Sequence, residues 1–597
     1  MQSIAGLLAL MLVAVVFALG LSGPFLFDDF SNLLQNPDLR AFASHRSALW
    51  PLLSHGVAGP LGRPIALLSL AWQARITGFE VVPFKLFNLA VHLVNTVLVF
   101  LFSLQLLRVA GGHPRCWARI PVQTGQAPPA QPPRFLWPWA GLAALLWAVH
   151  PLVLTPVLYV VQRMTSMSAL GVLAALNLAL FGRARLMAGK QAWISLWPGV
   201  FLAGLFAVLS KETGALLPVF LLVLDATLLS GSALPVGEAK THWRTFIRIF
   251  GWMPVALGAL AMPFFALRAA AGFAQRDFTL SERLWTEGRV MLSYLKLLAV
   301  PDLRALGLYH DDIVLSTGWL HPWTTLPAWL ALGGLALAAF TLRRRARWFA
   351  FAVGFFLASQ LMESTFVPLE LMHEHRVYLG MLGPLLAAVA GIRHLRLSVR
   401  SPVGPWPTAI ALLAPVLALS LITAQRAADW GSPFGFARTE ASHHPNSPRA
   451  LHESTVLLGR LAESSHNPDD RMRLFSLAVQ AAQHTVRNSP KETKPLVALC
   501  ILCSEAGCRV SPAKWAQLGE NMRTGRRSDL LLGDLQALLD CQGDGSCHFD
   551  AEELVPVFDG LLANRGLSTP QAERLRRLRL AILSSRAPAA VGKATAP

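Results

Sequence analysis

Long apolar stretches recur from the start of the chain to about residue 424 and then stop. Each is long enough, or nearly so, to cross the hydrocarbon core of a bilayer, which takes about 20 apolar residues in a helix. The pattern predicts an all-α membrane domain over residues 1–429 with eleven spans, near 3–21, 84–107, 136–155, 157–182, 193–209, 213–230, 249–267, 323–341, 349–363, 375–391 and 405–424. A short apolar segment at 289–300 contains Lys296, and we expect it to be a re-entrant or surface helix.

After Trp430 the pattern changes to amphipathic helical segments separated by Pro, Gly and Asn. The segments 447–465, 470–490 and 494–507 are examples. Helix pairs that end near Pro and carry an Ala/Leu face are typical of degenerate tetratricopeptide (TPR) repeats, although no period of about 34 residues persists. Residues 430–597 are therefore predicted to form a separate, soluble, helical, TPR-like domain.

Composition restricts the class of protein. The chain has 597 residues, of which 54% are hydrophobic and only 14% charged, well below the charged fraction of a soluble protein. One globular core cannot hide that apolar excess, so a cytosolic or nuclear protein is excluded. The formal net charge of +18 would suggest nucleic acid in a soluble protein, but in a membrane protein it is first explained by topology, and we expect no nucleic-acid partner.

The loop charges predict the orientation in the membrane. With the N-terminus inside, the cytoplasmic loops are 108–135, 183–192, 231–248, 342–348 and 392–404, and each carries three or four Lys or Arg, with Glu238 as their one acid. Short loops rich in Lys and Arg stay in the cytoplasm. An odd number of spans then places the C-terminal domain outside the cytoplasm. The segment 1–21 lacks a basic start and is interpreted as a retained span rather than a signal peptide, and the Pro-rich loop 108–135 is interpreted as a connector.

Five of the six cysteines lie in the last hundred residues, and Cys116 stands alone. Cys541 and Cys547 flank a turn-like QGDGS and are a candidate disulfide in an oxidising compartment. Cys500, Cys503 and Cys508 offer a second pair with one thiol left over. The competing interpretation is a zinc site at the C-x2-C spacing, but a second such pair is absent from the sequence, and we favour disulfides.

Polar residues gather in five clusters in or beside the predicted spans, all on the predicted non-cytoplasmic side. An ionisable residue at such a place is costly and is a functional candidate by default. The clusters are Asp28, Asp29, Asn32, Asn36 and Asp38; Arg63 with Lys85, Asn88, His92 and Asn95; Gln162, Arg163, Thr165 and Ser166; Lys211 and Glu212; and Glu363, Glu370, His373, Glu374, His375, Arg376 and Tyr378.

Each cluster also has a structural interpretation. The acidic pair could cap the following helix, Asn88, His92 and Asn95 could join spans as polar contacts, and Lys211 and Glu212 could neutralise each other. The HEH triplet at 373–375 invites a metal, but neighbours on one helix point apart. The acidic run at 309–312 is interpreted as an ordinary acidic loop in preference to a ligand-binding one.

A transporter would more often show broken helices near the midplane and internal repeats, and the sequence shows neither clearly.

These clusters in this order resemble one family. The runs FDD..N…N.D, GRP, FNL.VHL.N, HP…..V…..R, KE.G…P and EHRVYL are similar to those of integral-membrane glycosyltransferases of the C superfold (GT-C). More narrowly, they resemble bacterial relatives of the protein O-mannosyltransferases that carry TPR repeats behind their membrane domain. The resemblance covers about residues 1–424 well and the tail loosely.

The resemblance implies an extracytoplasmic transferase in the bacterial inner membrane that moves a sugar from a polyprenyl-phosphate carrier to an acceptor hydroxyl, expected on Ser or Thr of a protein. It implies that Asp28 or Asp29 in the first outer loop (about 22–83) is the general base of an inverting displacement. Arg376, Arg163, Lys211, His375 and, less directly, Arg63 are the candidates for the departing phosphate. We expect support from Glu212, Glu374, Tyr378, Asn32 and Asn88. The resemblance implies no metal and no cofactor.

Other interpretations stay open at this point. The acceptor could be lipid A or another glycan, and the C-terminal domain could stabilise the protein rather than recruit an acceptor. A transporter or flippase of lipid-linked sugars and a non-catalytic envelope scaffold are the alternatives from other classes.

Overall fold

The computed structural model describes residues 2–44, 62–111, 136–230, 237–398, 405–526 and 528–584. Most of the Pro-rich loop, with Cys116, and the middle of the first outer loop lie outside this range. Within it the chain is helical, and the only β pairing is an isolated bridge between Gly318 and His321. The chain divides into two compact units, residues 1–270, 280–308 and 315–435 in the first and residues 271–279, 309–314 and 436–597 in the second.

The first unit contains the apolar helices. Its α-helices are α1 (Gln2–Ala18), α2 (Pro37–Ala43), α4 (Pro64–Thr77), α5 (Val81–Gly111), α6 (Trp137–Ala148), α7 (Leu154–Leu158), α8 (Arg163–Met187), α9 (Val200–Ser210), α10 (Leu217–Leu224), α11 (Glu238–Ile247), α12 (Met253–Ala270), α13 (Leu280–Ala299), α14 (Thr325–Leu342), α15 (Arg347–Gln360), α16 (Leu382–Ser398) and α17 (Pro405–Asp429). Short 3₁₀ or π turns connect or extend them: η1 (Phe30–Leu34), η3 (Pro151–Val153), η4 (Val160–Gln162), η5 (Ser195–Gly199), η6 (Glu212–Leu216), η7 (Asp225–Leu229), η8 (Arg248–Trp252), η10 (Leu303–Ala305) and η11 (Glu374–Val377).

Six helical runs in the described residues are long and apolar enough to cross a membrane. They are Val81–Val109, Val160–Met187, Glu212–Leu229, Glu238–Ala274, Thr325–Leu342 and Ile410–Asp429. The pair Trp137–Ala148 and Pro151–Leu158 makes a seventh if its 60° bend is counted within one span, and Ile4–Ala18 and Ser195–Ser210 are shorter apolar helices. These helices are consistent with a membrane protein, while the count of eleven spans stays a prediction.

Three boundaries differ from the predicted ones. The span predicted at 375–391 begins later, because His375 and Arg376 lie in the 3₁₀ turn η11 and α16 starts only at Leu382. The helical run expected at 249–267 extends over Glu238–Ala274. The segment 289–300 is the second half of α13, a longer helix with charged residues in its first half, including Glu282, Arg283 and Glu287.

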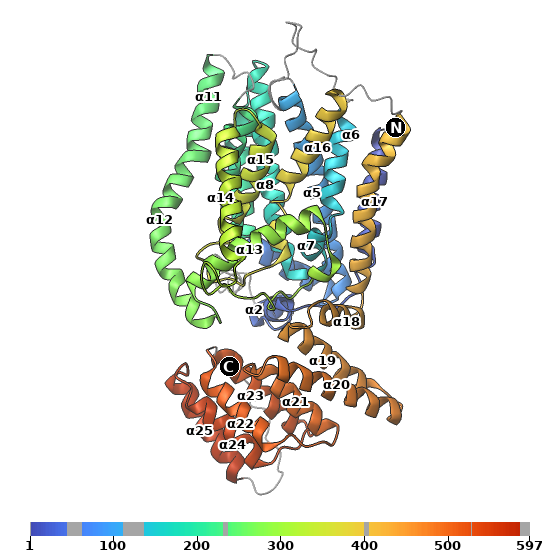
Figure 1. Ribbon diagram of the computed structural model, residues 1–597, viewed down its shortest axis with the longest axis vertical. Coiled ribbons are helices and arrows are strands. Elements are labelled where there is room, and N and C mark those ends of the chain that lie inside the picture. Colours follow the sequence, from blue (N-terminus) through green and yellow to red (C-terminus); the bar gives the residue numbers. More distant parts are fainter. Residues whose placement is uncertain are drawn as a thin grey trace. The chain divides into compact units, whose positions relative to one another are not determined.

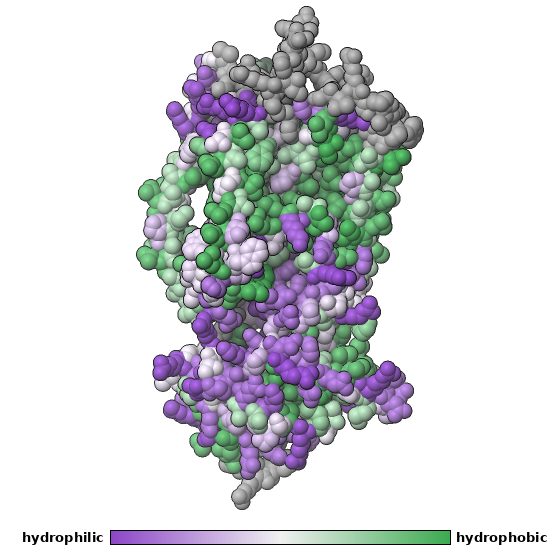
Figure 2. All heavy atoms as spheres, viewed as in Figure 1, coloured by the Kyte–Doolittle hydropathy of each residue, from purple (hydrophilic) through white to green (hydrophobic). Residues whose placement is uncertain are grey.

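The long helices of the first unit run side by side, and α13 lies across them near one end (Figure 1). The run Val160–Met187 is central, since 78% of its most apolar window is buried, whereas Glu238–Ala274 runs along the margin with 6% buried. Apolar side chains cover the outer surface of these helices in the view of Figure 2. A helix that is apolar all round and unburied is suited to lipid contact.

The second unit is a stack of helices with its own core. After α18 (Pro433–His443), which begins in the first unit, come α19 (Pro448–Ser464), α20 (Pro468–Asn488), α21 (Thr493–Glu505), α22 (Pro512–Thr524), α23 (Ser528–Gly543), α24 (Ala551–Leu562) and α25 (Thr569–Ser584). Ser447 and Asn467 cap α19 and α20, each followed by Pro at the first helical position, as helix starts favour. The helices predicted near 447–465, 470–490 and 494–507 are confirmed, and the TPR-like arrangement stays a prediction.

Candidate functional site

The predicted clusters meet at one end of the helical bundle. They stand where α1 ends, where α5 and α8 begin, where α9 ends, and around the turn between α15 and α16. Hydrogen bonds join these chain segments across 62 to 286 residues of sequence. The site is therefore a junction of helix ends rather than one motif.

The acidic pair separates into a buried and a partly exposed carboxylate. Asp29 is fully buried, and its two oxygens accept hydrogen bonds from the backbone N–H of Leu26 (2.9 Å) and Val161 (2.7 Å). Burial raises the pKa of Asp29 to about 7, against the effect of these hydrogen bonds. Asp28 is half-buried, and its backbone N–H donates to the hydroxyl of Tyr159 at 2.9 Å. The preceding Phe27 has a positive φ of 38°, a strained conformation that the surrounding contacts hold in place.

Lys85 fixes the chain just before the acidic pair. Its ammonium is fully buried and donates to the carbonyls of Gly20 (3.2 Å) and Gly23 (2.9 Å). Gly23 packs so closely on Trp430, at the end of α17, that a Cβ there would overlap the Trp430 carbonyl oxygen. Lys85, which was predicted on one polar face with Asn88, His92 and Asn95, thus orders the loop of the acidic pair.

A pocket lies beside a buried group of charges. Lys211, Glu363, His375 and Arg376 all line it, and the Lys211 ammonium is 2.7 Å from the Glu363 carboxylate. Burial lowers the pKa of Lys211, and Glu363 opposes that shift. Burial alone would raise the pKa of Glu363, but Lys211 and Arg376 bring it below its ordinary value. The pocket is therefore lined by an ion pair and a guanidinium.

His375, a candidate for the departing phosphate, lines the first pocket. Burial, followed by the nearby Lys211, lowers its pKa well below 6.5, so the imidazole is neutral in the absence of a ligand. The ring stacks on His373, with centroids 5.1 Å apart, and His373 is 3.0 Å from Glu370. A phosphate in the pocket would meet a neutral imidazole beside two cations.

A second pocket adjoins the acidic loop. Its lining includes Asn32, Asn36, Arg63 and Met164, on a floor of Ala and Leu side chains from α4. Arg63 adopts a left-handed backbone conformation (φ 48°) directly before α4, and its Nε is 2.9 Å from the Glu212 carboxylate. Asn32 donates to the Asp28 carbonyl at 2.9 Å, and Asn36 caps α2.

Arg163, at the start of α8, joins this helix to α4 and α5 by hydrogen bonds. It is fully buried and donates to Asn88 (2.7 Å), Gln73 (2.5 Å) and the backbone carbonyls of Ser69 and Phe84. Asn88 in turn donates to the Val160 carbonyl. The geometry thus assigns Arg163 and Asn88 to holding α4, α5 and α8 together, and neither residue lines the two pockets described above.

Glu374 and Tyr378 also make internal contacts. The two Glu374 oxygens pair with the Arg426 guanidinium of α17 at 2.5 and 2.8 Å, and one accepts the N–H of Gly307. The Tyr378 hydroxyl contacts His92 (2.8 Å) and Asn95 (3.1 Å), and the Tyr378 ring also borders the first pocket. Glu374 thus joins the turn η11 to α17, and Tyr378 joins the residue after that turn to α5.

Sequence reasoning missed Arg283 and Arg426. Arg283 is fully buried in α13 and donates to four backbone carbonyls of the turn after α15, those of Glu363, Thr365, Leu369 and Glu370. It also pairs with Glu287 at 2.9 Å. The spacing of Arg283 and Glu287, four residues apart on a helix, was visible, but that spacing is equally typical of a surface ion pair.

The acidic run 309–312 belongs to the second unit. Asp311 accepts hydrogen bonds from the Ser447 hydroxyl and from the N–H of Arg449 at the start of α19, and Asp312 is 3.1 Å from His444. The Tyr309 hydroxyl donates to Glu453 at 3.1 Å. These contacts support the interpretation of the run as a structural loop.

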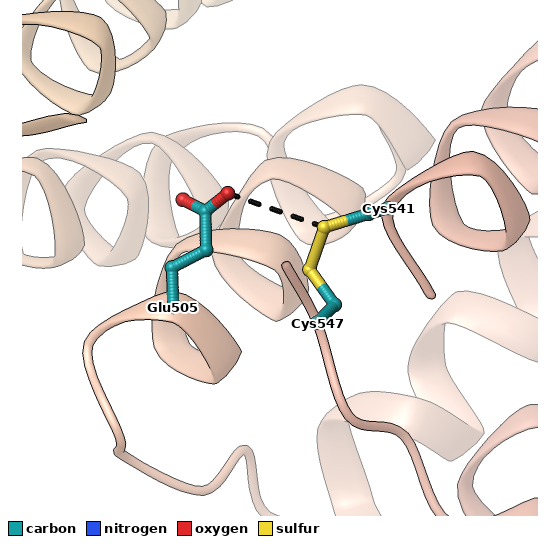
Figure 3. Close-up of side chains that lie close together, drawn as sticks. All are labelled: Glu505, Cys541 and Cys547. Atoms are coloured by element: carbon teal, nitrogen blue, oxygen red, sulfur yellow. Dashed lines mark hydrogen bonds between the residues drawn. A yellow bond between two sulfur atoms is a disulfide. The ribbon is translucent and has the colours of Figure 1, made fainter. Parts of the chain in front are cut away.

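The cysteines of the second unit pair as predicted. Cys541 is joined to Cys547 and Cys503 to Cys508, while Cys500 is a buried free thiol. Glu505 points toward Cys541, with its oxygen 4.0 Å from the sulfur (Figure 3). Glu505, Cys541 and Cys547 are the one described group whose ligand atoms lie close enough for a metal ion, but both sulfurs are already bonded to each other. Asp550 and Glu553 of the QGDGSCHFDAEE run form a capping box on α24.

Comparison with known proteins identifies no relative: no family model, curated protein or solved structure matches this chain. The chemistry of the site must therefore be argued from its own residues. Those residues place the Lys211–Glu363 ion pair and the Arg376 guanidinium around the first pocket and Arg63 at the second, at the end of an apolar bundle. Such a set suits a ligand with an anionic head and a lipid tail.

Proposed function

We propose that the protein is a membrane glycosyltransferase that moves a sugar from a polyprenyl phosphate to an acceptor hydroxyl. The observation that carries the proposal is the gathering of Lys211 and Arg376 in the first pocket and of Arg63 in the second, which Asn32 and Asn36 of the Asp28 loop also line. The resemblance of the ordered motifs to GT-C glycosyltransferases supports it. The substrate's isoprenoid tail would remain in the bilayer beside the apolar helices.

The donor phosphate binds in the first pocket. Lys211 and Arg376 face it, and as the bond to the sugar breaks, negative charge grows on the phosphate oxygens that they contact. In the free protein, Glu363 balances Lys211. An incoming phosphate competes with Glu363 for that ammonium, and neutral His375 donates or accepts a hydrogen bond.

Asp28 is the general base and Asp29 positions it. A base must reach the proton that it takes, and geometry is weighed before pKa. Asp29 is fully buried and engaged by two backbone N–H groups, whereas Asp28 is partly exposed. The acceptor oxygen forms a bond to the anomeric carbon, its proton moves to Asp28, and the carbon–oxygen bond to the phosphate breaks. The configuration at that carbon is inverted.

The proposal includes eleven spans, with the site and the C-terminal unit on the extracytoplasmic side of a bacterial inner membrane. The acceptor is a Ser or Thr hydroxyl of an extracytoplasmic protein. The C-terminal unit either recruits that acceptor or stabilises the chain.

A genetic experiment tests the function. The gene is deleted in its host and restored as wild type, Asp28→Asn or Leu260→Ala, a matched control on the exposed surface of α12. Intact masses of envelope proteins are then recorded. A hexose- or pentose-sized increment that wild type and the control restore, and Asp28→Asn does not, supports the proposal.

Other outcomes assign other functions. Unchanged protein masses direct attention to lipid A and polysaccharide as acceptors. Full rescue by Asp28→Asn in a strain where wild type rescues contradicts the catalytic role of Asp28. Movement of a lipid-linked sugar across vesicle membranes, with no new glycosidic bond, would indicate a flippase.

A further inference from the structure

Residues 361–373, which we call the pocket loop, connect α15 to the turn η11 and form no helix. Glu363 belongs to this loop, and His375 and Arg376 follow it in η11. These three residues line the first pocket. A loop without regular structure leaves its backbone N–H and C=O groups to be paired elsewhere. The polar lining of the pocket therefore depends on the contacts that hold this loop.

Arg283 of α13 holds the first part of the pocket loop. Its side chain is fully buried, and its guanidinium donates to four carbonyls of the loop at 2.5 to 3.1 Å. One guanidinium can bind several acceptors because its planar fork has five N–H donors. The Glu363 carbonyl is thus bound to Arg283, while the Glu363 carboxylate is bound to Lys211 in the pocket.

Tyr294 of α13 holds the other end of the pocket loop. Its hydroxyl donates to the His373 carbonyl at 2.9 Å and accepts from the His373 N–H at 2.9 Å. The same carbonyl accepts the backbone N–H of Arg376 at 3.2 Å within the turn η11. Arg283 and Tyr294 are about three helical turns apart, so they lie on one face of α13.

The pocket loop in turn fixes Arg376. The Arg376 guanidinium donates to the carbonyls of Glu370 (2.6 Å) and Leu371 (2.9 Å), and the Glu370 carbonyl also accepts from Arg283. A cation that is held in place before the ligand arrives stabilises the ligand's charge without reorganisation. Tyr294 carries no charge and does not line the first pocket, so its hydroxyl can act on a ligand there only through the loop.

We propose that Arg283 and Tyr294 are positioning residues of the donor site, which hold the pocket loop in the conformation that directs Arg376 at the phosphate. The inference rests on the proposed function and deepens it, since it adds α13 to the elements that determine phosphate binding. Neither residue touches the ligand. Loss of one anchor lets the loop relax and moves the Arg376 guanidinium away from the phosphate oxygens.

Tyr294→Phe tests the proposal because it removes only the hydroxyl. The purified full-length protein in detergent is titrated with farnesyl phosphate and with farnesol, which has the same tail and no phosphate. Wild type is expected to bind farnesyl phosphate more tightly than farnesol. Tyr294→Phe is expected to bind farnesyl phosphate about tenfold more weakly, roughly the contribution of one charge-assisted hydrogen bond, and to bind farnesol as wild type does.

Thr423→Val is the matched control. Thr423 is fully buried in α17, and its hydroxyl donates to the Val149 carbonyl; neither residue lines a pocket described above. Tyr294→Phe and Thr423→Val each remove one buried hydroxyl that binds a backbone carbonyl, so both should lower the melting temperature. Only Tyr294→Phe should weaken the binding of farnesyl phosphate.

A double-mutant cycle with Arg376→Gln shows whether the effect passes through Arg376. In that background, Tyr294→Phe is expected to change the affinity for farnesyl phosphate by less than about twofold, because the displaced cation is already absent. Arg283→Lys keeps a cation beside Glu287 but has fewer donors for the four carbonyls, and it is expected to weaken farnesyl phosphate binding as Tyr294→Phe does.

Three results would overturn the inference. They are unchanged binding of farnesyl phosphate by Tyr294→Phe, an equal loss of binding in Thr423→Val, and a full tenfold loss when Tyr294→Phe is added to Arg376→Gln. In each case wild type still prefers farnesyl phosphate to farnesol, and the proposed function stands. Wild type without that preference refutes the phosphate pocket on which both proposals rest.

Discussion

Asp28 and Asp29 are neighbours in the sequence, yet their surroundings predict opposite effects of substitution. Asp28→Asn removes a partly exposed base, and we expect turnover to fall by about 10²–10⁴-fold with a smaller loss of stability than Asp29→Asn causes. Asp29→Asn places an amide N–H group against one of two backbone N–H donors, which costs about 1–3 kcal/mol of stability. Thermal unfolding and turnover of both variants check this. A larger loss of stability in the Asp28 variant than in the Asp29 variant would contradict the division of roles.

The buried carboxyl of Asp29 also predicts a dependence of stability on pH. Its pKa is about 7 in the folded protein and 3.8 ordinarily, so the folded state holds a proton that the unfolded state releases between these values. The stabilisation is complete below about pH 4 and is lost as the pH rises through about 7. The melting temperature of wild type should therefore fall over this interval more steeply than that of Asp29→Asn. Parallel curves for the two proteins would refute the raised pKa.

At the scale of helices, Gly23 joins the end of α1 to the end of α17. Gly23→Ala forces a Cβ into the Trp430 carbonyl, and we expect a loss of stability of about 1–3 kcal/mol, because overpacking displaces backbone. Gly6→Ala in the first half of α1 is the control, since a Cβ there has nothing within 4 Å, and Ala favours a helix. Equal melting temperatures for the two variants would contradict the close contact.

The Arg426–Glu374 pair fixes α17 to the turn η11. Arg426→Met leaves a buried carboxylate without its cation, which costs about 3–5 kcal/mol. Adding Glu374→Gln removes that charge and keeps an acceptor for the Gly307 N–H, so the double variant should be more stable than Arg426→Met. Arg523→Gln, which breaks an exposed pair with Glu520, is expected to leave the melting temperature unchanged. If the double variant is less stable than Arg426→Met, the Arg426–Glu374 ion pair is not the contact that holds α17 against η11.

The sequence pattern predicted which residues share a helix face, but it did not predict which groups those residues contact. The face of Lys85, Asn88, His92 and Asn95 followed from helical spacing, and all four are fully buried. Their partners could not be predicted, because most are backbone carbonyls that lie 56 to 72 residues away in the sequence.

The same limit explains Arg163 and Arg283. The sequence shows that an Arg lies inside an apolar helix, but it does not show whether that Arg contacts a ligand or backbone carbonyls. In the structure Arg163 donates to acceptors within the protein. Arg283 looked like part of a solvated helix face, since nothing local shows that the turn after Gln360 folds over it.

At the scale of the whole molecule, the cysteines report which side of the membrane each part faces. The loop charges predict Cys116 in the cytoplasm, while the Cys541–Cys547 and Cys503–Cys508 bonds need an oxidising compartment. When intact cells are treated with an impermeant maleimide, this protein should therefore carry no label. A reductant should expose the C-terminal thiols without permeabilisation, and permeabilisation alone should expose Cys116.

A Cys116→Ser variant is the control for that experiment and should abolish only the label that needs permeabilisation. Buried Cys500 should stay unlabelled while the domain is folded. Label on Cys116 in intact cells would invert the orientation and place Asp28, Lys211 and Arg376 in the cytoplasm. A polyprenyl-phosphate sugar presented on the outer face could not then be the donor, so this one labelling pattern would overturn the proposed reaction as well as the topology.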